Sequence, residues 1–153
     1  MDYFEDYKDI LQLFNKYGVK YLVIGAYAMG NYGYSRNTLD IDLWIEKSVE
    51  NAKKIQKAFS DFPIPYEITV TELMSENFVL QIGLAPMRID VLTDIDGVDF
   101  LEAWDNRTNN SLFSEEINFI SLHDLIKNKS ATNRPKDKYD VVELEKIKKL
   151  ADT

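Results

Sequence analysis

Two aspartates interrupt an apolar, strand-like segment, and they constrain the fold and chemistry of this chain more than any other feature. Between Leu39 and Glu46 the residues alternate, so Asp40 and Asp42 share one face of a predicted strand with Trp44, whereas the other face is aliphatic. Aspartate is disfavoured in strands, and two neighbouring carboxylates repel each other unless a cation or a set of donors offsets their charge. The pair therefore predicts a site for Mg²⁺ or Mn²⁺, and an edge strand with a solvated acidic face is the alternative interpretation.

A third carboxylate lies in another predicted strand. Asp90 is flanked by Ile89 and Val91, and if its strand lies beside the first one, three carboxylates converge. Three converging carboxylates are the ligand set that a two-metal phosphoryl-transfer site requires. Asp94 and Asp96 follow in a DIDG turn, and we interpret them as turn formers.

A glycine directly after an apolar strand supplies a second candidate feature. The run Tyr21 to Ile24 predicts a buried strand, and Gly25 separates it from a short helical segment. Backbone N–H groups at a helix start attract anions, and a glycine lets a phosphate approach the backbone closely. The segment is not a Walker A loop, because Asn31 and Tyr32 occupy the positions where that loop needs Lys and Ser or Thr.

Composition limits the classes of function. The formal charge of −8 argues against broad binding of nucleic acids, although a local basic patch remains open. The chain has no cysteine and one histidine, His123, so a metal would have oxygen ligands. No apolar run approaches the roughly 20 residues that a membrane span needs, so we expect a cytoplasmic protein without a membrane partner.

The hydrophobic pattern predicts one α/β (α+β) domain, residues 1–153, with a mixed β-sheet flanked by helices. Strands are expected at 21–24, 39–46, 66–71, 78–82, 88–93 and 116–120, with the fourth and fifth forming a hairpin. Helices are expected at 4–17, 26–31, 49–59, 98–105, 121–128 and 135–150.

These motifs together resemble the DNA polymerase beta-type nucleotidyltransferase superfamily. The residues that carry the resemblance are Gly25-Ala26, the RxTxDxD pattern from Arg36 to Asp42, Asp90 on a later strand, and the RPKDKYD segment that begins at Arg134. The closest branch is that of small bacterial proteins similar to lincosamide nucleotidyltransferases and to the toxins of abortive-infection systems.

The resemblance implies a nucleotidyltransferase-like mixed sheet and a set of site residues. Asp40 and Asp42 would bind metal, and Asp90 would bind the catalytic metal and help deprotonate the acceptor. The other implied site residues would bind a nucleoside triphosphate such as ATP, and they are Gly25, Ala26, Arg36, Thr38, Lys127 and Lys129. Arg36 could instead pair structurally with an acid, and a solvated helix end is the alternative interpretation for Lys127, Lys129 and Arg134.

The activity that the resemblance implies is metal-dependent transfer of a nucleoside monophosphate to a hydroxyl of a small molecule, a protein or an RNA. The superfamily usually has Gly or Ser after the first glycine, whereas this chain has Ala26, which has no side-chain donor. A catalytically degenerate nucleotide- or partner-binding module of the same fold, for instance within a toxin–antitoxin pair, is therefore the alternative. Because few residues follow Asp90, a homodimer or a partner protein could complete the acceptor pocket.

Overall fold

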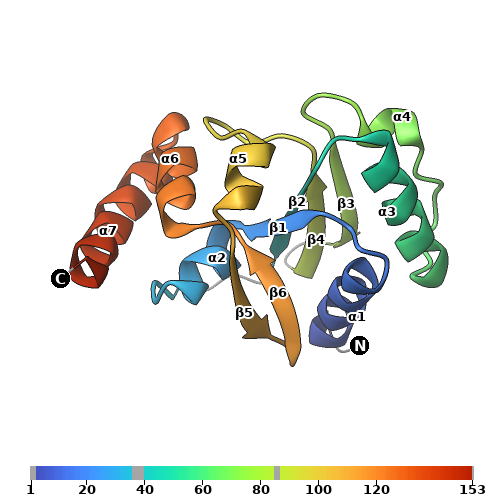
Figure 1. Ribbon diagram of the computed structural model, residues 1–153, viewed down its shortest axis with the longest axis horizontal. Coiled ribbons are helices and arrows are strands. Elements are labelled where there is room, and N and C mark those ends of the chain that lie inside the picture. Colours follow the sequence, from blue (N-terminus) through green and yellow to red (C-terminus); the bar gives the residue numbers. More distant parts are fainter. Residues whose placement is uncertain (1–2, 36–39, 85–86, 153) are drawn as a thin grey trace.

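The computed structural model describes residues 3–35, 40–84 and 87–152, in which a mixed sheet has the strand order β3-β4-β2-β1-β6-β5 (Figure 1). The strands are β1 (Tyr21–Ile24), β2 (Ile41–Ile45), β3 (Val79–Leu84), β4 (Met87–Leu92), β5 (Thr108–Leu112) and β6 (Glu115–Phe119). The pairs β1–β6 and β2–β4 are parallel, and the other neighbouring strands are antiparallel. The predicted fold class, a mixed sheet flanked by helices, is confirmed.

Helices cover both faces of this sheet. They are α1 (Tyr3–Lys16), α2 (Gly25–Asn31), α3 (Val49–Asp61), α4 (Val70–Leu73), α5 (Phe100–Asp105), α6 (Leu122–Ala131) and α7 (Pro135–Ala151). Helices α1 and α3 lie together at one end of the molecule, and α6 and α7 lie together at the other end (Figure 1). No helix within the described residues has both the length and the apolar character that a membrane span requires.

Strand β2 is an interior strand with both faces covered. Ile41, Leu43 and Ile45 are fully buried on the face that α1 and α3 cover. On the other face Trp44 is buried too, because Phe100 of α5 packs against it with the ring centroids 5.0 Å apart. The alternative interpretation of a solvated edge strand is therefore wrong, and the polar part of this face is confined to the start of β2.

Two segments differ from the sequence-based prediction. Residues 66–71 do not form a strand, because Thr69 and Glu72 make a capping box in which each side chain accepts a hydrogen bond from the backbone N–H of the other, and helix α4 follows. Strand β5 was not expected, since its sequence TNNSL has no apolar alternation. Its place in the sheet comes from antiparallel pairing with β6.

The junction between β1 and α2 requires a glycine for two reasons. Gly25 has a φ of +68°, a backbone region that side chains with a Cβ rarely adopt. In addition, Ile24 is the register partner of Asp42 on β2, so the next residue passes close to the Asp42 carboxylate. A Cβ at position 25 would lie 2.4 Å from Oδ2 of Asp42.

We expect Gly25→Ala to lower the free energy of unfolding by about 2 kcal/mol or more, because the positive φ alone costs roughly 1–2 kcal/mol and the new methyl group displaces Asp42. Gly30→Ala is the matched control, since a Cβ there meets nothing within 4 Å and the residue lies in the same helix. Alanine in place of a helical glycine should stabilise the protein by up to about 1 kcal/mol. Urea unfolding measures both, and equal effects at the two positions would contradict a special requirement for glycine at position 25.

Candidate functional site

The three predicted carboxylates lie together near the start of strand β2. Asp42 and Asp90 are register partners on the parallel strands β2 and β4, and Asp40 comes directly before β2. All three line one cleft of about 500 Å³, which also borders α2, α6 and the start of α7. The structure therefore brings together the residues that the sequence singled out, while their role as metal ligands remains a prediction.

Arg88 was not among the predicted site residues, yet it lies at the centre of this cluster. Its Nε donates to Oδ1 of Asp90 over 2.6 Å, and its NH2 group donates to Oδ2 of Asp90 over 3.0 Å. The same guanidinium lies 3.6 Å from Oδ2 of Asp40, and the Arg88 backbone N–H donates to Oδ1 of Asp40. Arg88 precedes Asp90 by two residues in a strand, so the alternation rule could have placed both side chains on one face.

The negative charge of the cluster is only partly offset. Burial, together with the charges of Asp90 and Asp40, raises the pKa of Asp42 to about 6, whereas Lys129 and Arg88 act in the opposite direction. A carboxyl group whose pKa is raised in this way is one that a further cation would stabilise in its charged form.

The donor chemistry fits a divalent cation that prefers oxygen ligands. As the side chains stand, however, no group of three or more His, Asp and Glu residues within the described ranges is arranged around a metal position. Arg88 donates two hydrogen bonds to Asp90, so both oxygens of this carboxylate are already engaged. Metal binding would therefore require these side chains to rearrange.

The glycine segment lines the same cleft as the carboxylates. Gly25 and Ala26, the first residues of α2, border it, and no side chain caps this helix start. Ala26 supplies no side-chain donor. Arg36 and Thr38, which were also predicted to bind the nucleoside triphosphate, lie outside the described residues.

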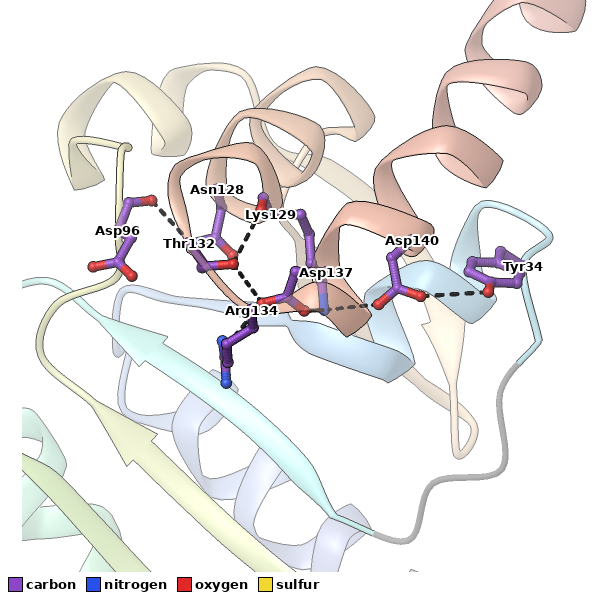
Figure 2. A network of polar contacts seen from close by, with 8 residues as sticks. All are labelled: Tyr34, Asp96, Asn128, Lys129, Thr132, Arg134, Asp137 and Asp140. Carbon is purple, nitrogen blue, oxygen red and sulfur yellow. Dashed lines mark hydrogen bonds and ion pairs between the residues drawn. The ribbon is translucent and has the colours of Figure 1, made fainter.

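Basic residues from the junction of α6 and α7 form the opposite side of the cleft. The residues of this junction that line the cleft include Lys129, Thr132, Arg134, Lys136 and Asp137. Figure 2 shows that the Arg134 side chain leaves the start of α7 toward the sheet, while Lys129 lies between the helices. The cleft therefore has three carboxylates and Arg88 on its sheet side, and Lys129, Arg134 and Lys136 with Asp137 on its helical side, and sequence spacing alone did not show this arrangement.

The two lysines of the predicted site have different surroundings. Lys129 is buried, and its Nζ lies 3.2 Å from Oδ1 of Asp137 and 3.4 Å from Oδ2 of Asp140. The interpretation of Lys129 as part of a solvated helix end is therefore wrong, because its ammonium is buried and pairs with two carboxylates of α7. Lys127 is exposed and is not among the residues that line the cleft.

The turn after β4 closes another end of the cleft. Oδ2 of Asp94 accepts hydrogen bonds from Nζ of Lys47 over 2.8 Å and from the backbone N–H of Asn77 over 2.7 Å. The backbone carbonyl of Asp96 accepts a hydrogen bond from the Asn128 side chain (Figure 2). These contacts connect the turn to α6 and to the start of β3, as expected for residues that shape a loop.

The raised pKa of Asp42 predicts a stability that falls as pH rises. Asp42 binds a proton more tightly in the folded state than in the unfolded state, so its ionisation destabilises the fold progressively from the ordinary value of 3.8 to about 6. The full cost above this window is about 3 kcal/mol. Asp42→Asn should therefore match the wild-type protein near pH 3.5 and exceed its free energy of unfolding by up to that amount at pH 7.

Urea unfolding in EDTA across this pH range provides the measurement, because EDTA removes divalent cations that would offset the charge. Asp96→Asn is the control, since it removes one charge from an exposed residue at the cleft rim. A stability gain for Asp42→Asn that is the same at both pH values would contradict the assignment of the cost to ionisation.

Removing the buried ammonium should destabilise the protein strongly. Lys129→Met leaves Asp137 and Asp140 buried without their shared cation, which should lower the free energy of unfolding by about 3–5 kcal/mol. Lys127→Met is the matched control, because Lys127 lies two residues away on the same helix and is exposed, and such changes stay within about 0.5 kcal/mol. Thermal and urea unfolding compare the two, and a small effect of Lys129→Met would show that the ion pairs are not formed in solution.

The comparisons with known proteins include a similarity to a solved structure. The chain matches no protein-family model and no curated protein sequence. It is similar to the crystal structure of a "putative nucleotidyltransferase" from Thermotoga maritima, with a TM-score of 0.56 and 16% sequence identity, over 95% of this chain and 88% of that chain. At this level of identity the similarity is one of fold. The chain therefore has a mixed α/β fold similar to that of a nucleotidyltransferase.

Proposed function

We propose that this protein is a metal-dependent nucleotidyltransferase that transfers a nucleoside monophosphate from a nucleoside triphosphate to a hydroxyl acceptor. One observation carries the proposal: Asp40, Asp42 and Asp90 converge from β2 and β4 in a cleft whose opposite side is basic. A metal–triphosphate complex has the matching polarity, since the cation side suits carboxylates and the phosphate side suits Lys and Arg. The similarity in fold to a Thermotoga maritima protein described as a "putative nucleotidyltransferase" supports the same activity.

Each residue of the cleft has a separate role in this proposal. Asp40 and Asp42 would hold the metal together with Asp90, and Mg²⁺ or Mn²⁺ would stabilise the charge that develops on the phosphates. The acceptor oxygen attacks the α-phosphorus, the bond to the bridging oxygen breaks, and pyrophosphate leaves. Asp90 takes the proton of the acceptor hydroxyl. The backbone at Gly25 and Ala26 borders the phosphates, where close approach to a glycine is possible.

The acceptor is proposed only as a class: a hydroxyl on a small molecule, a protein or an RNA. The acidic surface favours a cationic small molecule over RNA, because charge of one sign steers oppositely charged partners. In this proposal a second subunit or a partner protein completes the acceptor pocket.

A nucleotide- or partner-binding module without catalysis is the second candidate, and two observations favour it. Arg88 engages Asp90 with two hydrogen bonds, so Asp90 is not free to accept a proton in this arrangement. Ala26 also lacks the side-chain donor that active relatives of this fold usually provide. The two candidates differ in whether any acceptor becomes labelled.

The decisive experiment follows the phosphates of the substrate. Incubation with Mg²⁺ and α-labelled ATP, GTP, CTP or UTP, together with aminoglycosides, lincosamides, tRNA or cell lysate, should transfer label to an acceptor, whereas γ-label should leave as pyrophosphate. Asp90→Ala should reduce transfer by about 10²-fold or more, because proton transfer by a positioned group contributes about that much.

Controls separate binding from chemistry. Asp90→Ala should largely keep nucleotide affinity in calorimetry, since Asp40 and Asp42 remain to hold the metal and Asp90 acts on the acceptor. Asp105→Ala should keep full transfer, since Asp105 is an exposed residue of α5. Nucleotide binding without transfer to any acceptor would favour the binding module instead.

A further inference from the structure

Ala26 has no side-chain donor, so the cations of the cleft are the side chains that could contact a phosphate. Arg88 is already engaged with Asp90 and Asp40. Lys129 is enclosed by the two α7 carboxylates. The charge of both cations is thus already offset by carboxylates, which weakens their attraction for a phosphate.

Asp137 is held rigidly by several donors. Its Oδ1 accepts a hydrogen bond from Lys129 and its Oδ2 accepts one from the Thr132 hydroxyl over 2.6 Å, while Nε of Arg134 forms an ion pair with Oδ2 at 2.9 Å. Burial by itself would raise the pKa of Asp137, but the Thr132 hydrogen bond and the charges of Lys129 and Arg134 hold it below its ordinary value. Asp137 is therefore a fixed anion on which other side chains can be oriented.

The same network continues away from the cleft. Lys129 also contacts Asp140, which is completely buried, and the hydroxyl of Tyr34 donates to Asp140 over 3.3 Å (Figure 2). Lys129 is thus fixed from behind by Asp140 and from the cleft side by Asp137. Asp137 is therefore held in place by buried side chains, so it can fix the position of Arg134.

Arg134 is the member of this network that faces the cleft. Its Nε is tied to Asp137, while its side chain is 75% exposed and lines the cleft that contains Asp40, Asp42 and Asp90. Within the described residues, its two terminal nitrogens have no hydrogen-bond or ion-pair partner. A guanidinium anchored at Nε presents those nitrogens as a fork with the geometry that phosphate oxygens match.

Building on the proposed function, we propose that Arg134 binds the terminal phosphates of the triphosphate and that Asp137 is the residue that positions it. The start of the 17-residue helix α7 adds to this preference for an anion, because Pro135 and Lys136 open the helix at the cleft and the positive end of the helix dipole lies there. Lys136 lines the same region, but no carboxylate among the described residues holds its ammonium in place. Arg134 thus provides the contact that Ala26 lacks.

Calorimetric titration with magnesium tripolyphosphate tests the contact without depending on turnover. Arg134→Gln should weaken binding about tenfold or more, as expected for the loss of a charge-assisted, two-point contact. Arg107→Gln is the matched control: it removes the same charge from an arginine that stacks on Trp104 outside the cleft, and it should leave the affinity unchanged.

The positioning role of Asp137 has its own readouts. Arg134→Lys keeps the charge but loses the Nε that Asp137 holds, so it should bind tripolyphosphate nearly as weakly as Arg134→Gln. Asp137→Asn should also weaken binding, and if Asp137 acts through Arg134, the double variant with Arg134→Gln should bind no more weakly than Arg134→Gln alone. Unfolding curves verify that each variant is folded, and Arg134→Lys carries the test if Asp137→Asn is not.

The outcomes separate this inference from the proposed function. Unchanged tripolyphosphate affinity of Arg134→Gln, or an equal loss in Arg107→Gln, would overturn the role of Arg134, whereas transfer of α-label would still support the nucleotidyltransferase. Full affinity in Arg134→Lys would overturn the positioning role of Asp137 but not the phosphate contact made from position 134. A wild-type protein that binds no tripolyphosphate would overturn the contact, whereas the proposed function would be overturned only by the absence of α-label transfer.

Discussion

Repulsion between carboxylates that cannot move apart is the constraint on which the cleft depends. Because β2 and β4 are parallel and in register, Asp42 and Asp90 are held side by side by the backbone hydrogen bonds of the sheet itself. The positive charges of Arg88 and Lys129 partly offset the charge of these carboxylates. The glycine at position 25 leaves room for the Asp42 carboxylate. A fold that maintains such a cluster in its interior accepts a stability cost, as is common where function requires it.

Sequence reasoning succeeded where local periodicity decides structure. Alternation placed Asp40 and Asp42 together, and a second apolar strand placed Asp90 beside them. It did not identify the buried state of Lys129, because the carboxylates that enclose it come from the next helix and only the packing of α6 on α7 brings them into contact. Residues 66–71 were assigned to a strand from their composition, but a side-chain capping box outweighed that preference.

The helical side of the cleft is built from polar contacts to an unusual degree. Helix α7 packs mainly on α6, and its buried residues comprise two aspartates and Leu144. Its attachment therefore depends in part on ion pairs whose geometry is directional, whereas α1 is attached mainly by buried aliphatic and aromatic side chains. Directional contacts suit a surface that must present a side chain at a defined place, because they restrict its orientation as well as its distance.

The position of β1 in the sheet also bears on how the chain acquires its structure. β1 pairs with β2, which soon follows it in the sequence, and with β6, which lies far along the sequence. In the second pair, Val23 and Phe119 are register partners. Pairings between segments so far apart form slowly, since a long loop must close before the contact stabilises it. A chain in which β6 is not yet paired would have Asp42 and Asp90 in register but would expose one edge of β1. The acidic side of the cleft therefore needs only the pairing of β2 with β4, whereas the basic side also needs α6 and α7, which follow β6 in the chain.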